Sequence, residues 1–114
     1  MILNPIEVYN KRTYKGPGEY LGRPNPLGNP FTHLTTSKIP GIIVVQSREI
    51  AVQECDKWLD AVLYIDGPPR NEFARLLAIY RATGSLKLIC WCVPELCHAT
   101  SIARRLEVAA GRVK

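Results

Sequence analysis

The sequence predicts a small α/β domain with a partly parallel sheet of three to five strands and about three helices. Its length of 114 residues allows one hydrophobic core, so we expect a single domain over residues 1–114. Apolar residues make up 46% and charged residues 22% of the chain, which is typical of globular proteins. Strand-like runs come first, followed by the order strand, helix, helix, strand, helix, which is typical of two-layer or three-layer α/β folds.

The first part of the chain is expected to hold short strands and one long loop. Residues 5–9 alternate weakly between apolar and polar positions and suit a first strand. Glycines and prolines recur from Gly16 to Gly41, which excludes a helix there, although residues 19–22 suit a short strand. The β-branched run IIVVQ at 42–46 predicts a buried strand.

Two helices are expected next. Ser47 is a suitable N-cap, and apolar residues recur at helical spacing from Ile50 to Leu63. The segment Asp66-Gly67-Pro68-Pro69 is expected to end this helix. Asn71 is expected to cap a second helix, FARLLAIYRAT, which stops at Gly84.

The last two elements carry the most distinctive residues. The nearly continuous apolar run LKLICWC at 86–92 predicts a strand at the centre of the sheet, covered on both faces. A final helix is expected from Cys97 to Ala110, before Gly111. Its start lies beside the carboxyl end of the preceding strand, where α/β folds usually bind their ligands.

The charge of the chain favours an anionic partner. The formal net charge is +5, and four of the basic residues cluster near the N-terminus: Lys11, Arg12, Lys15 and Arg23. No dense basic run typical of a nucleic-acid arm is present, so nucleic acid remains one possible partner among others. We expect no membrane partner and a cytoplasmic location, because no apolar run approaches the roughly 20 residues of a membrane helix and no secretion signal opens the chain.

Three of the four cysteines lie close together. Cys55 stands alone in a helical pattern and is expected to be buried. Cys90, Cys92 and Cys97 fall within eight residues, and His98 follows Cys97 directly. On a strand Cys90 and Cys92 would face one side and Trp91 the other. A disulfide framework is not expected in a reducing compartment.

Three interpretations of this cluster remain open. Cys90, Cys92, Cys97 and His98 supply the donors that zinc favours, although their spacing lacks the paired knuckles of common zinc sites. Alternatively, the helix start is an anion site that lowers the pKa of Cys97, so that Cys97 is a candidate nucleophile and His98 a candidate acid or base. In the third interpretation the cysteines only fill the core.

The segment GRPNPLGNPF at 22–31 is expected to form one shaped loop, because its prolines restrict the backbone while its glycines permit tight turns. Such a loop can present Arg23 and Asn29 to a ligand, since the guanidinium suits phosphate or carboxylate. The side chains of Leu27 and Phe31 are expected to be buried in the hydrophobic core.

This loop and the later CWCVPELCH at 90–98 resemble the motifs of domain of unknown function 4326, an uncharacterised family common in bacteriophages and bacteria. The segment from Val8 to Arg12 and the Trp58-Leu59 pair fit the same pattern, so the resemblance covers nearly the whole chain. It implies that both motifs meet in one pocket, but it transfers no activity. Members often carry an acidic residue soon after the Cys-His pair, where this chain has the sequence Ala99, Thr100 and Ser101.

The leading hypothesis is binding of a small phosphorylated ligand, such as a nucleotide or nucleotide derivative, between these two motifs. The residues expected to fix the ligand are Arg12, Arg23 and Asn29, with Cys92, Cys97 and His98 as the opposite wall. Processing of the ligand is left open, since the sequence shows no complete catalytic triad, paired carboxylates or phosphate-loop motif. The alternative is a small zinc-stapled interaction module that binds nucleic acid or a host protein. If a bacteriophage encodes the chain, its location would be the host cytoplasm.

Overall fold

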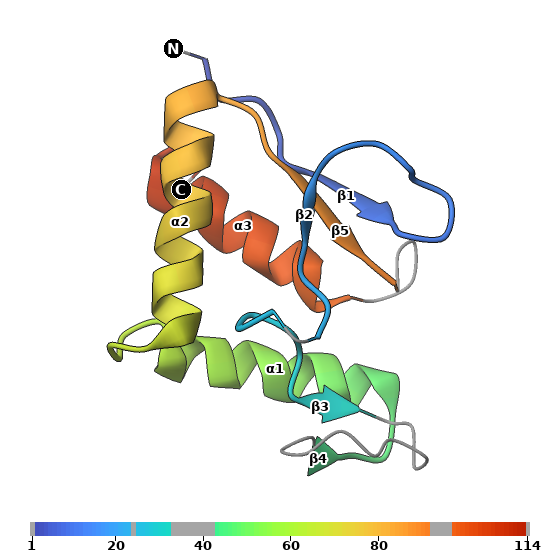
Figure 1. Ribbon diagram of the computed structural model, residues 1–114. Coiled ribbons are helices and arrows are strands. Elements are labelled where there is room, and N and C mark those ends of the chain that lie inside the picture. Colours follow the sequence, from blue (N-terminus) through green and yellow to red (C-terminus); the bar gives the residue numbers. More distant parts are fainter. Residues whose placement is uncertain (1, 24, 33–42, 92–96, 114) are drawn as a thin grey trace.

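The computed structural model describes residues 2–23, 25–32, 43–91 and 97–113. It shows the expected α/β class, with three helices and a three-stranded parallel sheet in this part of the chain (Figure 1). The elements in chain order are β1 (Glu7–Asn10), β2 (Glu19–Tyr20), β3 (Phe31–Thr32), β4 (Ile43–Val44), α1 (Arg48–Val62), α2 (Pro68–Thr83), β5 (Lys87–Cys90) and α3 (His98–Ala110). Within the described ranges, no helix has both the length and the apolar content needed to cross a membrane.

The larger sheet has the strand order β1-β5-β2, and both neighbours run parallel to β5. The central position expected for the apolar run at 86–92 is therefore confirmed for its described part. The register places Tyr9 of β1 and Tyr20 of β2 on either side of Ile89. These three side chains share one face of the sheet, because paired residues of neighbouring strands point the same way.

The two faces of this sheet have different coverings. Helix α3 packs against β1 and β5 on one face, and α2 packs on α3 (Figure 1). Leu88 and Cys90, which point to the helical face, are fully buried. The connection between β1 and β2 turns back over the other face, where Gly18 lies against Ile89. The helices and the β1–β2 connection thus lie on opposite sides of β5.

Helix α1 begins as the sequence predicts, because the Ser47 hydroxyl oxygen accepts a hydrogen bond from the Ile50 amide at 3.2 Å. It is tied to α3 by Arg105, whose guanidinium donates to Asp56 at 2.8 Å and to Asp60 at 2.7 Å. The hydrogen bond from Arg105, followed by the one from Ser101, lowers the pKa of the Asp56 carboxyl.

Two expectations about single elements are corrected. The strand expected to be buried at 42–46 is an exposed β4, which within the described residues pairs with β3 in a separate two-stranded sheet; Ile43 and Val44 are 52% and 49% exposed. A β-branched run predicts extended backbone, but burial depends on what packs over it. The second helix begins at Pro68, three residues before Asn71. Proline suits the first helical turn, since its backbone dihedral is already helical and no amide hydrogen is needed there.

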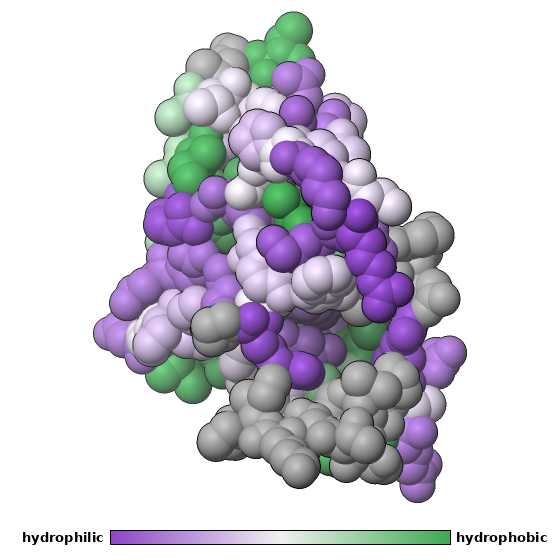
Figure 2. All heavy atoms as spheres, turned by 45° about the vertical axis from the view of Figure 1, so that its right-hand side comes forward, coloured by the Kyte–Doolittle hydropathy of each residue, from purple (hydrophilic) through white to green (hydrophobic). Residues whose placement is uncertain are grey.

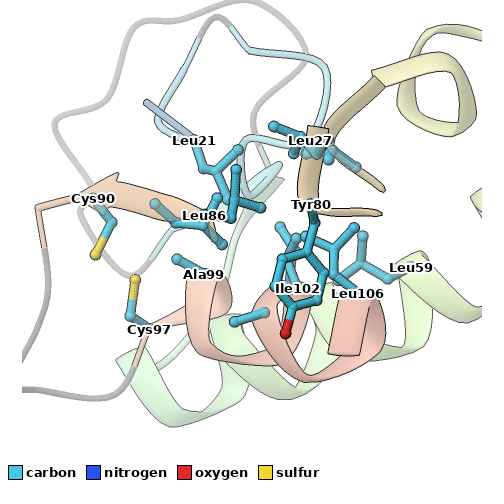
Figure 3. Packing of buried hydrophobic residues seen from close by; sticks show 14 residues of the cluster. Leu21, Leu27, Leu59, Tyr80, Leu86, Cys90, Cys97, Ala99, Ile102 and Leu106 are labelled. Carbon is cyan, nitrogen blue, oxygen red and sulfur yellow. The ribbon is translucent and has the colours of Figure 1, made fainter. Parts of the chain in front are cut away.

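The core lies between α1, α2, α3 and the helical face of the sheet. Figure 3 shows its leucines around Tyr80, whose ring is fully buried and whose hydroxyl donates to the Asn4 carbonyl oxygen at 2.6 Å. Leu27 is buried in this core as expected, and Phe31 packs against the core while staying partly exposed. The loop at 22–31 is therefore anchored by its apolar residues.

Candidate functional site

A pocket of about 480 Å³ lies at the carboxyl ends of β1 and β5, on the face of the sheet away from α3. We call it the basic pocket; its lining residues are Lys11, Arg12, Tyr14, Lys15, Gly16, Ile89 and Trp91. Its size is within the range of small-ligand sites. Its position is the one where open α/β sheets usually bind ligands, because the strands end there and the connecting loops supply side chains.

Asn10, the last residue of β1, organises the basic turn that forms one wall. Its side-chain oxygen accepts from the Arg12 amide at 2.8 Å, and its carbonyl oxygen accepts from the Tyr14 amide at 2.9 Å. Its side-chain amide donates to the Trp91 carbonyl oxygen at 3.0 Å. One asparagine thus fixes the turn at 11–14 against the end of β5, so that both walls of the basic pocket are held together.

Aromatic side chains form the other part of the lining. Tyr14 stacks on Tyr9 with ring centroids 4.2 Å apart, and its hydroxyl donates to the Pro17 carbonyl oxygen at 2.7 Å. Trp91 is 47% exposed, and its indole Nε1 donates to the Tyr20 hydroxyl at 2.7 Å. These contacts hold flat apolar rings beside the charged groups of the basic pocket.

The electrostatic character of the basic pocket is positive. Lys11, Arg12 and Lys15 line it, and within the described ranges no carboxylate forms an ion pair with any of them. Figure 2 brings this side of the molecule forward and shows that strongly hydrophilic side chains cover much of it. Cationic side chains without a counterion raise the local concentration of anions. The basic pocket is therefore suited to an anionic ligand.

The predicted ligand residues Arg23 and Asn29 do not line the basic pocket. The Arg23 guanidinium donates to two carbonyl oxygens of its own loop, those of Asn29 at 2.7 Å and Phe31 at 2.9 Å. Asn29 in turn donates to the Ala51 carbonyl oxygen of α1 at 3.3 Å and accepts from the Phe31 amide at 2.8 Å. Both side chains therefore fix the shape of the loop, and a direct role in ligand binding stays a prediction. Of the predicted ligand residues, Arg12 does line the basic pocket.

The loop is also held from α2. The Asn25 side-chain amide donates to the Glu72 carboxylate at 2.8 Å, and its oxygen accepts from the Leu27 amide at 2.8 Å. The hydrogen bond from Arg75, followed by the one from Asn25, lowers the pKa of Glu72 against the opposing effect of burial. Loop and helix are joined by a charged network, which no property of the loop sequence alone could predict.

Cys97 and His98 form a thiol–imidazole pair at the start of α3, with 3.8 Å between the Cys97 Sγ and the His98 Nδ1. The His98 Nε2 lies 3.0 Å from the Leu21 carbonyl oxygen. Since a carbonyl oxygen can only accept, Nε2 carries the proton and Nδ1 faces the thiol as an acceptor. Desolvation lowers the pKa of His98, with the nearby Arg23 charge as a smaller cause, so the imidazole is neutral.

This pair joins the two motifs but lies away from the basic pocket. Leu21 directly precedes the GRPNPLGNPF loop, and His98 ends CWCVPELCH, so this contact brings the start of the loop near the second motif. The expected common pocket of the two motifs stays a prediction. Cys97 and His98 are only 2% and 7% exposed, however, and Cys97 belongs to the hydrophobic cluster. A catalytic role for the pair stays a prediction, since a substrate would have to reach buried atoms.

The four predicted zinc ligands are described only in part. In Figure 3 the sulfurs of Cys90 and Cys97 point toward one another within the core, while Cys92 lies outside the described residues. In the part of the chain that the structure describes, no three potential ligands are grouped around a common point. Both ring nitrogens of His98 face protein partners already. The expected burial of Cys55 is confirmed, and that burial raises the pKa of its thiol to about 12.

The sequence did contain the signals for the basic pocket. The basic cluster after the first strand includes Lys11 and Lys15, and strand alternation predicts that Trp91 points away from the thiols. Leu88 and Cys90 face α3, whereas Ile89 and Trp91 face the pocket, so the Cys90 thiol and the basic residues lie on opposite sides of β5. The ligand site predicted at Cys92, Cys97 and His98 stays a prediction, and Cys92 lies outside the described residues.

Because His98 is buried and neutral, acid should destabilise the protein. The unfolded chain takes up a proton on this histidine below its usual pKa of 6.5, whereas the folded protein does so only at lower pH. We expect the free energy of unfolding to fall between pH 7.5 and 5.5, by up to about 1.4 kcal/mol per pH unit below the usual pKa. Urea denaturation at a series of pH values measures this. The slope should be present in the unaltered protein and absent in His98→Gln; equal slopes in both proteins would contradict the assignment.

Comparison with known proteins gives one match. No curated protein and no solved structure matches the chain. A family model described as Domain of unknown function (DUF4326) matches residues 6–108, a range that contains the basic turn, the GRPNPLGNPF loop, β5 and the Cys97-His98 pair. The match covers far more than half of the chain, and the protein therefore belongs to the DUF4326 family.

Proposed function

We propose that this protein binds a small phosphorylated ligand, such as a nucleotide, in the basic pocket. The observation that carries the proposal is the combination of three cationic side chains with two aromatic ones around a volume of about 480 Å³. A phosphate group matches the cations, and a flat ring matches the aromatic side chains. The cations of the proposed site are Lys11, Arg12 and Lys15, and its rings are those of Tyr14 and Trp91.

The lysines support phosphate binding through their placement. The Lys15 Nζ lies 3.4 Å from the Lys11 carbonyl oxygen, so its ammonium is held close to the turn. The Lys11 Nζ lies 5.0 Å from the centre of the Tyr20 ring, a cation–π contact that keeps this ammonium beside the aromatic wall. Both ammonium groups retain hydrogens that a phosphate oxygen can accept. We therefore assign the phosphate to the turn and the remainder of the ligand to the space beside Trp91.

Removing one pocket charge tests the proposal. Lys15→Gln is expected to weaken binding of AMP or ATP by about tenfold or more, because a charge-assisted hydrogen bond contributes about 1.5–3 kcal/mol. Isothermal titration calorimetry measures the affinity, which should also fall as salt rises. The matched control is Lys57→Gln on α1, whose lysine is 75% exposed and pairs with Glu54 away from the basic pocket.

Two results would overturn the proposal. Equal losses in Lys15→Gln and Lys57→Gln would show that only the net charge of the protein matters. A short single-stranded oligonucleotide that binds where every mononucleotide and phosphosugar fails would contradict a small-ligand site and favour a nucleic-acid partner. Thermal shift in the presence of the same compounds is an independent measurement, since a ligand that binds the folded state raises its melting temperature.

A further inference from the structure

We infer that Trp91 is the stacking platform for the base of a nucleotide in the basic pocket, and that Tyr20, accommodated by Gly22, positions it. This inference rests on the proposed function and narrows its ligand from phosphorylated compounds in general to those that carry an aromatic base.

Trp91 offers aromatic surface and no free polar atom. The indole has one polar group, Nε1, and that group donates to the Tyr20 hydroxyl at 2.7 Å. The side chain lines the basic pocket and is 47% exposed. The main-chain carbonyl of the same residue accepts from Asn10, which fixes the backbone beneath the ring. A ligand beside Trp91 therefore meets a flat apolar ring, which matches the π face of a base and nothing in a phosphosugar.

Tyr20 is held between two groups. It is the last residue of β2, paired with Ile89 of β5, so its backbone is fixed in the sheet. Lys11 lies over one side of its ring, with 5.0 Å from Nζ to the ring centre. A Cβ atom added at Gly22 would overlap the hydroxyl and the adjoining ring atoms of Tyr20. The hydroxyl that anchors Trp91 thus occupies space that is open only because residue 22 has no side chain.

The requirement for glycine at this position is one of space and not of backbone conformation. The described glycines with positive φ are Gly67, Gly84 and Gly111, and Gly22 is not among them. Any residue could adopt its backbone, but even alanine would push the Tyr20 ring aside. Gly22 opens the GRPNPLGNPF loop and Trp91 lies in CWCVPELCH, so the two segments also meet in the contact chain Gly22, Tyr20, Trp91.

The ligand class is tested by comparing AMP with ribose 5-phosphate, which carries the same phosphate and sugar without the base. In a Trp58→Phe background Trp91 is the only tryptophan. AMP should quench the tryptophan emission and bind about tenfold more tightly than ribose 5-phosphate. Trp91→Leu should remove most of this difference, because it should weaken AMP binding far more than ribose 5-phosphate binding. If ribose 5-phosphate binds as tightly as AMP, or Trp91→Leu weakens both equally, the inference fails while the proposed function stands. If neither compound binds, both fail.

The positioning part is tested with two variants. Gly22→Ala should change the Trp91 emission maximum and the quenching of this emission by acrylamide, and Tyr20→Phe should do so to a lesser degree. Both variants should reduce the preference for AMP, with little change in the affinity for ribose 5-phosphate. If Gly22 had only a structural role, Gly22→Ala would lower the stability of the protein without altering the preference for AMP. Tyr20→Phe keeps the test decisive if Gly22→Ala fails to fold. Unchanged emission and an unchanged preference in the variant that folds would overturn the positioning role.

Discussion

Arg23→Met is expected to lower the free energy of unfolding by about 2–4 kcal/mol, because it removes two charge-assisted hydrogen bonds and leaves partly buried carbonyl oxygens without a donor. The guanidinium now donates to the carbonyl oxygens of Asn29 and Phe31, which lie six and eight residues further along the loop. Methionine fills similar space but has no N–H group, so packing is largely kept while these bonds are lost. Urea denaturation gives the loss directly.

Arg12→Met is the matched control, since it removes the same charge from the same part of the chain. The Arg12 side chain lines the basic pocket and is exposed, so the expected change in stability is within about 0.5 kcal/mol. Affinity for a nucleotide should fall instead. The opposite result would be a loss of stability in Arg12→Met and a loss of nucleotide affinity alone in Arg23→Met. It would support the ligand-binding role that the sequence predicts for Arg23.

Leu106→Ala is expected to cost about 2–5 kcal/mol of stability, the range found for leucine truncations in protein cores. Leu106 is fully buried on α3, and Figure 3 shows it beside Ile102 near the ring of Tyr80. The helix packs against both neighbouring helices and the sheet, so the space left by the missing side chain cannot close without moving several elements. The midpoint of urea denaturation should therefore fall well below that of the unaltered protein.

Val108→Ala on the same helix provides the control. Val108 is 45% exposed, and its truncation should change stability by no more than about 0.5 kcal/mol. Similar losses at residues 106 and 108 would mean that α3 does not bury the face described here. A small loss at both would mean that α3 contributes little to the core.

Much of the fold could be predicted because its signals are local. The start of α1 at Ser47, the end of α2 at Gly84 and the bounds of α3 follow from capping residues and helical spacing, and the structure confirms them. The central position of β5 follows from its continuous apolar run. The pairing of β3 with β4 and the exposure of Ile43 could not be predicted, because both depend on a neighbour distant in sequence.

The position of the basic pocket depends on more than local signals. Alternation along β5 correctly separates Trp91 from Cys90, but nothing in the sequence says which face of the strand meets the helices and which remains accessible. Arg23 has the chemistry of a phosphate ligand, yet its donors satisfy carbonyl groups of its own loop. A guanidinium serves either purpose equally well.

The sequence by itself determined the class of fold, the helix boundaries other than the start of α2, the apolar central strand and the positive charge near the first strand, since each depends on the type and spacing of neighbouring residues. The tertiary structure decided that Cys90 and Cys97 are buried, that Lys11 and Trp91 share a pocket, and that the Tyr20 hydroxyl fits beside residue 22 only if that residue is glycine. These outcomes depend on which surfaces of distant segments pack together, and local sequence patterns carry no information about that choice.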